Sequence, residues 1–214
     1  MTKQEQTTPK SKSYHHGNLR NTLIVAAAQL IEERGSLDFA MIDAARRAGV
    51  SSAAPYRHFK DKDALLEAVT QVAFMALSET SRNVAASHPQ GSTACLIAQG
   101  KAYIRFVTDH PEFYDLMWGD MGLRAEVTDD SELKTSGFYL LVDAVQHWCE
   151  ATLIEHYDAL ELAVRLWGIA HGLACLAMNR HINRFLPDAD VYSLFEASTH
   201  AFLDGLRREN ADCD

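Results

Sequence analysis

The sequence is poor in features that mark secreted and membrane-spanning proteins. Its four cysteines, Cys95, Cys149, Cys175 and Cys213, lie far apart and form no CxxC pair, a usage typical of proteins whose thiols stay reduced. No apolar run reaches the roughly 18 residues of a membrane span. Residues 1–13 are polar, unlike the leader of a secreted protein. We therefore expect a cytoplasmic protein.

Motifs of common enzymes are also missing. The chain has no GxSxG turn, no HExxH pair and no glycine-rich phosphate loop, and its ten histidines are scattered. His15 and His16 are adjacent, but no cysteine or carboxylate nearby completes a metal site. We therefore expect no enzyme, no cofactor and no metal.

Hydrophobic periodicity indicates an all-α protein. The 214 residues are 47% hydrophobic, enough for a sizeable core, and no strand pattern competes with the helical one. The pattern predicts helices at about 18–33, 61–86, 93–109, 111–118, 131–155, 158–182 and 188–208, with two short helices between the first two. We expect four segments: a tail (1–13), a small N-terminal domain (14–62), a C-terminal bundle (63–208) and a tail (209–214).

Residues 37–66 have the pattern of a helix-turn-helix. Apolar residues recur at helical spacing over 41–48. Gly49 then supplies the left-handed residue that a tight helix end requires. Ser51 or Ser52 can cap a second, very short helix, and a third helix follows. In DNA-binding proteins of this design the second helix enters the major groove.

Charge is divided between the two parts of the chain. The net charge is −9, but residues 1–62 hold ten Lys or Arg against six Asp or Glu, whereas residues 63–214 hold ten against twenty-three. The N-terminal part is therefore basic although the whole protein is acidic. Local positive potential is what contact with DNA phosphates requires.

The helix-turn-helix segment resembles the DNA-binding domain of the tetracycline-repressor (TetR) family. The resemblance rests on Gly49-Val50-Ser51, Tyr56, His58-Phe59, Lys62 and Leu65-Leu66. Residues 14–35 resemble the first helix of that family, and Trp167-Gly168 with His171-Gly172 resembles a C-terminal signature of one subgroup. The family implies a three-helix DNA-binding head and a C-terminal helical bundle for dimerisation and ligand binding.

Two positions depart from the family pattern. Ala40 stands where the family usually has a capping Ser or Thr, and Ile42 stands where it has a basic residue. Asp38 is a candidate to cap in place of Ala40. These departures support an alternative, a helical small-molecule-binding or adaptor protein whose DNA-binding head is degenerate.

Side chains that can contact DNA gather around the second short helix. Hydroxyls and cations there can bind phosphate oxygens, while small side chains can touch thymine methyls. The two adjacent histidines of the N-terminal arm can reach a neighbouring groove or the backbone. The predicted DNA-binding residues are Ser51, Ser52, Ala53, Tyr56, Arg57, His58, Lys62, His15 and His16.

The helix predicted at 158–182 is apolar nearly all round, so it needs cover on two sides. One face can meet its own bundle and the other a second subunit, as the resemblance also implies. The predicted dimer-interface residues are Leu162, Leu166, Ile169, Leu173, Leu176, Phe195 and Phe202.

Aromatic and methionine side chains of the C-terminal part can either fill the core or line a pocket for an apolar or aromatic effector. The candidate lining residues are Phe74, Phe106, Phe113, Met117, Trp118, Phe138, Trp148 and His171. His171 can instead be a hydrogen-bonded core histidine. The sequence as a whole predicts a homodimeric regulator of transcription, a repressor that binds a palindromic operator and responds to a small molecule.

Overall fold

The chain folds into helices only, within the residues that the computed structural model describes: 16–119, 137–154 and 156–211. These ranges contain nine α-helices and one 3-10 turn and no strand. The elements are α1 (His16–Arg34), α2 (Met41–Arg47), η1 (Pro55–Arg57), α3 (Lys62–Ala86), α4 (Thr93–Asp109), α5 (Pro111–Trp118), α8 (Gly137–Thr152), α9 (Ala159–Met178), α10 (His181–Phe185) and α11 (Val191–Ala211).

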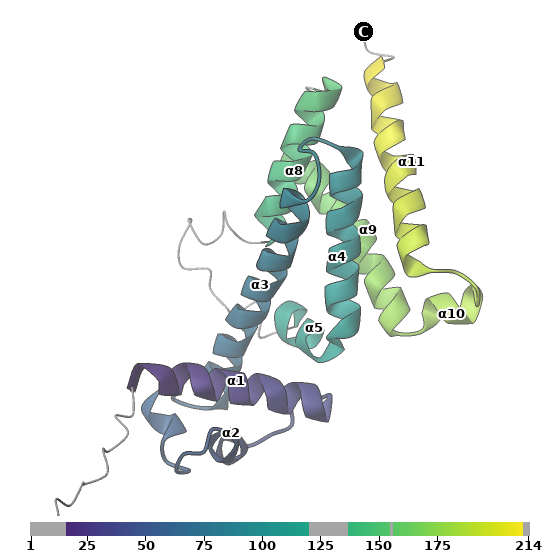
Figure 1. The fold of residues 1–214 in the computed structure, drawn as a ribbon. Coiled ribbons are helices and arrows are strands. Elements are labelled where there is room, and N and C mark those ends of the chain that lie inside the picture. The colour runs from purple at the N-terminus through teal and green to yellow at the C-terminus, as the bar shows by residue number, and fades with distance from the viewer. Residues whose placement is uncertain (1–15, 120–136, 155, 212–214) are drawn as a thin grey trace, which may run out of the picture.

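The molecule has a small head and a larger body (Figure 1). The head contains α1, α2, η1 and the first turns of α3. Helix α3 rises from the head into the body, where it packs against α4 and α8. Helix α9 lies between α4, α8 and α11, and the short α5 lies where the body meets the head.

Glycines end two helices of the head as predicted. Gly35 and Gly49 have φ of 59° and 69°, values that a residue without a Cβ adopts freely. The head then closes around one apolar cluster, in which Leu23, Ile31 and Leu65 are fully buried. The predicted helix-turn-helix therefore has its own core.

The second helix of the motif is shorter than predicted. Ser52 is not its cap, because the turn starts after Ala54 and consists of the single 3-10 turn Pro55–Arg57. Pro55 occupies the first position, where its missing N–H costs no hydrogen bond. Asp61 then caps α3 as predicted, because its Oδ1 accepts the Ala64 N–H at 2.9 Å.

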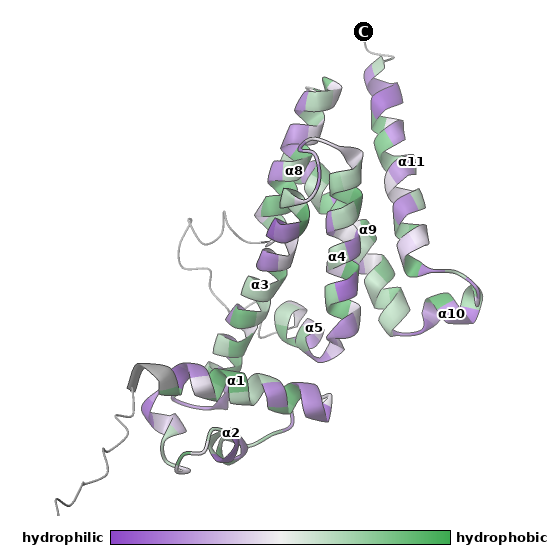
Figure 2. Cartoon of the chain, viewed as in Figure 1, coloured by the Kyte–Doolittle hydropathy of each residue, from purple (hydrophilic) through white to green (hydrophobic). Residues whose placement is uncertain are grey.

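The body has two apolar clusters. One joins α8, α9 and α11 around the buried Trp148 and Leu162. The other joins α3, α4, α5, α9 and α11 around Ile104, Met117 and Phe195. Figure 2 shows hydrophobic residues along α9, whereas α11 alternates between hydrophilic and hydrophobic residues.

The predicted helix at 158–182 is broken into two. Helix α9 ends at Met178, and Arg180 takes a left-handed conformation with φ of 58° before α10 begins. The C-terminal boundary also differs, since α11 continues to Ala211 and takes in the start of the tail predicted at 209–214. The tail predicted at 1–13 lies outside the described residues.

Helix α9 is long and apolar enough to cross a membrane by length and composition alone. In this fold, Leu162, Ala163, Leu166, Ala170 and Ala174 of the helix are buried against the rest of the chain. The core helix of a soluble protein can have the same length and apolar composition as a membrane span.

Candidate functional site

The turn after α2 presents a polar surface to solvent. Ser51, Ser52, Ala53 and Arg57 are exposed, and Tyr56 is 60% exposed. Pro55, between them, is buried. His58 is half-buried. Six of the nine residues predicted to bind DNA thus lie together on this turn and the loops beside it.

Lys62 is held by the protein itself. Its Nζ donates to the Leu37 carbonyl at 2.6 Å and lies 4.7 Å from the centre of the Phe39 ring. The contact ties the start of α3 to the segment before α2. An ammonium group has three N–H donors, so Lys62 can bind a phosphate as well as the Leu37 carbonyl. Its contact with phosphate stays a prediction.

The N-terminus of α2 is capped by a residue that the sequence reasoning missed. Asp38 does not cap it. Ala40 is the N-cap and offers no side-chain oxygen, but its own N–H donates to Asp43 Oδ2 at 3.1 Å. This hydrogen bond, with Arg34 at 3.2 Å, lowers the pKa of Asp43. A carboxylate three residues after the N-cap is a sequence pattern of helix N-termini, and it could have identified Asp43 as the capping residue.

The structure does not describe the side chains of the two arm histidines. His15 lies outside the described residues, and His16 begins α1 with a side chain that is likewise not described. Arg20, further along α1, lies 5.3 Å from the centre of the Phe59 ring. The predicted contacts of the arm stay predictions.

The body contains a cavity of about 50 Å³ lined by residues of α3, α4, α5, α8 and α9. Of the residues predicted to line a pocket, Trp118 and Phe138 do so. The lining is completed by Leu77, Ser81, Gln99, Tyr103, Gly137, Leu141, Trp167 and Ala170. This volume holds only a water molecule or two, so an effector requires the cavity to widen.

Other predicted lining residues pack elsewhere. Trp148 is buried in the cluster of α8, α9 and α11, where its Nε1 donates to Thr93 Oγ1 at 3.0 Å. Met117 is 1% exposed and belongs to the core. Phe74 packs edge-on against Trp118, behind the cavity wall. Phe106 and Phe113 lie beside His110 instead.

Two buried polar atoms of the lining residues have no partner in the described part of the chain. Gln99 Oε1 and Trp118 Nε1 make no hydrogen bond with the described residues, although both atoms are shielded from solvent. The Trp118 N–H is close enough to the Tyr103 hydroxyl to affect its pKa, but not in hydrogen-bonding geometry. An unpaired acceptor and an unpaired donor thus belong to residues that line a mainly apolar cavity, which sequence spacing did not reveal.

Both ring nitrogens of His171 are within hydrogen-bonding distance of tyrosine hydroxyls in the bundle. Its Nδ1 lies 2.7 Å from the Tyr103 hydroxyl and its Nε2 lies 2.9 Å from the Tyr114 hydroxyl. Burial lowers the pKa of the ring and raises the pKa of both hydroxyls. The ring also packs against Trp118 and Trp167, which line the cavity. His171 therefore supports the cavity wall from behind.

Three residues predicted for the dimer interface are core residues instead. Leu162, Leu166 and Phe195 are 1%, 4% and 1% exposed within their own chain. That part of the prediction is wrong, because Leu162 and Leu166 on α9 and Phe195 on α11 pack within the two apolar clusters of the body. Ile169, Leu173 and Phe202 are half-buried, and Leu176 is 44% exposed.

An open strip runs along the other side of α9. Its members recur every fourth residue and are exposed. They are Leu160, Val164, Gly168, Gly172 and Leu176. A Cβ added at either glycine would meet no atom within 4 Å. The strip is therefore flat, apolar at both ends and not covered by the described part of the chain.

Family models cover both parts of the chain. Residues 23–69 match the bacterial regulatory proteins of the tetR family, and residues 96–202 match the tetracyclin repressor-like C-terminal domain. The chain belongs to the TetR family. It is accordingly a DNA-binding regulator of transcription with a C-terminal helical domain, as its sequence predicted.

Solved structures agree with this assignment. A protein of unknown function from Rhodococcus sp. RHA1 is 30% identical, with a TM-score of 0.75 over 92% of this chain and 100% of its own. A putative transcriptional regulator from Pseudomonas aeruginosa PAO1 is 19% identical, with a TM-score of 0.68 over 92% and 93%. The regulator FadR from Bacillus subtilis, in complex with stearoyl-CoA, is 16% identical, with a TM-score of 0.62 over 84% and 95%. No relative was found among curated proteins.

Proposed function

We propose that this TetR-family regulator is a homodimeric, cytoplasmic repressor that binds a palindromic operator and releases it when a small molecule enters the body. The observation that carries the DNA-binding part is the exposed turn formed by Ser51–Arg57, with Tyr56 and Arg57 turned to solvent over a head that has its own core. Hydroxyl and guanidinium groups in this position bind phosphates and base edges.

Selection of bound duplexes from a random pool by the purified protein tests this proposal. A palindromic winner is expected, with half-sites one helical turn or about 34–36 Å apart. Its affinity should fall steeply with added salt. Tyr56→Phe and Arg57→Ala should weaken binding, whereas Asn83→Leu, an exposed change on α3 within the body, should not.

The rival function is a ligand-binding or adaptor protein with a degenerate head. Its support is Ala40, which cannot cap α2, and Ile42, which is 48% exposed where the family has a basic residue. The Asp43 hydrogen bond weakens the first point, because α2 is capped after all. Absence of an enriched duplex, or binding that salt does not weaken, would favour this rival.

The cavity supports the effector part of the proposal. Its walls are mainly aromatic and aliphatic, and Gln99 Oε1 and Trp118 Nε1 have no hydrogen-bond partner among the described residues. A polar group on an apolar or aromatic molecule can pair with either atom once the cavity widens. FadR, which shares the fold, is seen with stearoyl-CoA.

Helix α5 offers a route from the cavity to the head. Leu116 is fully buried in the core of the head, while Trp118, two residues later, lines the cavity. Widening of the cavity around Trp118 therefore moves a helix that also holds the head. An effector acts by favouring one separation of the two heads over another.

The open strip on α9 supports the homodimer. Two such strips can approach closely where the glycines lie and bury their leucines and valines at the ends. The half-buried Leu173 and Phe202 lie on the same two helices, α9 and α11, so they remain in the proposed interface.

A further inference from the structure

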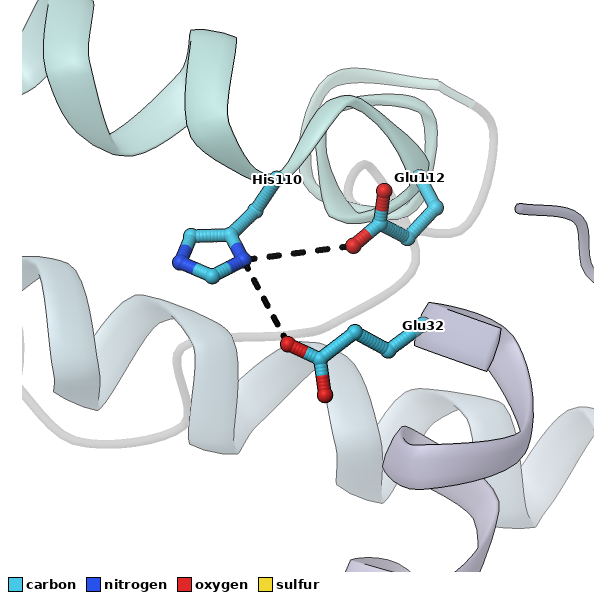
Figure 3. Close-up of side chains that lie close together, drawn as sticks. All are labelled: Glu32, His110 and Glu112. Atoms are coloured by element: carbon cyan, nitrogen blue, oxygen red, sulfur yellow. Dashed lines mark ion pairs between the residues drawn. The ribbon is translucent and has the colours of Figure 1, made fainter. Parts of the chain in front are cut away.

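Three side chains that are distant in sequence meet where the head joins the body. Glu32 is on the last turn of α1, His110 lies between α4 and α5, and Glu112 is on the first turn of α5. Figure 3 shows both carboxylates turned toward His110 Nδ1, at 3.8 Å for Glu32 and 3.9 Å for Glu112. All three ligand atoms lie within 4.8 Å of one another.

These distances suit a shared ion better than direct contact. A nitrogen-to-oxygen hydrogen bond is about 2.7–3.2 Å long, so neither carboxylate is hydrogen-bonded to His110. Bonds of about 2.0–2.2 Å in a tetrahedral zinc site place the ligand atoms roughly 3.3–3.5 Å apart. Small side-chain rotations would bring the three atoms to that spacing around one centre.

The carboxylate of Glu112 gives a second reason. Its side chain is only 8% exposed, and within the described part of the chain it has no polar partner other than His110 Nδ1 at 3.9 Å. Most of the side chain is therefore covered by protein, and charges in such positions are usually paired or bound to metal. Coordination to a metal ion would give the Glu112 carboxylate a partner of opposite charge.

The ligand types define the class of ion. One imidazole nitrogen with two carboxylate oxygens suits Zn²⁺ and its neighbours Mn²⁺, Co²⁺ and Ni²⁺. Mg²⁺ and Ca²⁺ prefer all-oxygen sites, and Cu⁺ prefers thiolates. The Glu32 side chain is 56% exposed and that of His110 is 39% exposed, so water has access to a fourth position.

We propose that Glu32, His110 and Glu112 form a binding site for a divalent first-row transition-metal ion that joins α1 of the head to the start of α5. The site would fix one position of the head on the body, because its ligands come from both parts. The site lies outside the effector cavity, and the proposal does not depend on the repressor proposal.

Cobalt and zinc binding to the full, tag-free chain tests the proposal. His15 and His16 are both replaced by Gln in every sample to remove competing ligands. One equivalent of Co²⁺ should give the visible absorption of a four-coordinate site without a thiolate band, and Zn²⁺ should displace it. Glu32→Gln and His110→Gln should each lower the affinity by more than about 100-fold. His200→Gln, an exposed change on α11, should leave it unchanged.

A second readout locates the ion. Zn²⁺ should slow hydrogen exchange in the last turn of α1 and the first turn of α5, and this effect should vanish in Glu32→Gln. Glu32→Gln changes an exposed residue, so the test does not require a substitution at the mostly covered Glu112. Absence of binding, or equal binding by Glu32→Gln, His110→Gln and His200→Gln, would overturn the proposal and leave an ion pair that needs no metal.

Discussion

Lys62 illustrates how one side chain can serve both the fold and the DNA surface. Its contacts with the Leu37 carbonyl and the Phe39 ring tie α3 to the segment that leads into α2. A hydrogen bond from a charged donor contributes more than one between neutral groups. The residue that the sequence marks as a phosphate contact therefore also holds the helix-turn-helix together.

We predict that Lys62→Ala lowers the free energy of unfolding by about 1.5–3 kcal/mol, the range for a lost hydrogen bond to a charged group. It should also weaken binding to all duplexes similarly. Urea denaturation and fluorescence anisotropy measure the two effects. Lys60→Ala, a neighbouring exposed lysine, should leave the unfolding midpoint unchanged. Equal midpoints for the two variants would show that the Leu37 contact contributes nothing.

His171 provides a prediction about pH. Burial lowers the pKa of its ring below the ordinary 6.5, so the unfolded chain binds the proton more tightly than the folded one. The contribution to stability is then complete above about pH 6.5 and is lost as the pH falls through the lowered pKa.

The test compares thermal midpoints between pH 5 and pH 7.5. The native protein should lose stability on the acid side, and His171→Gln, which keeps hydrogen-bonding groups but does not titrate, should lose less. His200→Gln, an exposed control, should follow the native curve. A slope that is identical in His171→Gln would place the pH dependence on another group.

At the scale of elements, the break after α9 is a feature that hydrophobic periodicity does not predict. The apolar pattern continues past Met178, but the chain turns at Arg180 with φ of 58°. A non-glycine residue pays roughly 1–2 kcal/mol for this conformation. Neither glycine nor proline stands there to signal the turn, so the sequence predicted one helix where the protein has two.

Arg180→Gly should stabilise the protein by about 1 kcal/mol, since glycine adopts this conformation freely and the backbone hydrogen bonds at this turn are kept. The urea midpoint should rise accordingly. Arg184→Gly is the matched control, because it places glycine inside α10 and should destabilise by a similar amount. A fall in the midpoint of Arg180→Gly would mean that its side chain matters more than its backbone.

Most other elements followed from the sequence. Gly35, Gly49 and Asp61 mark their helix boundaries with residues whose local preferences are strong. The recognition segment was less predictable, because a proline suits the first position of an α-helix and of a 3-10 turn equally. Local signals thus give the boundaries of helices better than their type.

At the scale of the whole molecule, the strip on α9 makes the assembly testable. Gly172→Leu should convert the dimer to a monomer of 23.8 kDa, because two strips could no longer approach closely. The single chain should tolerate the change, since nothing lies within 4 Å of the added Cβ. Light scattering gives the mass and circular dichroism gives the helix content.

Asn83→Leu serves as the control for this experiment. It adds the same side chain at an exposed position of α3, away from the strip, and should leave the mass of the dimer unchanged. If Gly172→Leu were still a dimer, the subunits would have to meet through another surface.

Sites built from distant residues were the least predictable part. Hydrophobic spacing identified α9 as a helix with two apolar faces, but it did not reveal which face meets the core, and Leu162 and Leu166 were assigned to the wrong one. Likewise, Gln99 and Trp118 come together only in the fold, as do Glu32 and His110. Motifs with fixed spacing are visible in a sequence, whereas such clusters depend on helix packing.

The two attachments of α5 also determine how the protein would respond in a cell. If Leu116 and Trp118 couple the head to the cavity, linkage requires that DNA lowers the affinity for the effector by the same factor as the effector lowers the affinity for DNA. Protein bound to its operator would then need more effector than free protein does. The switching concentration would therefore depend on the number of operators in the cell as well as on the cavity.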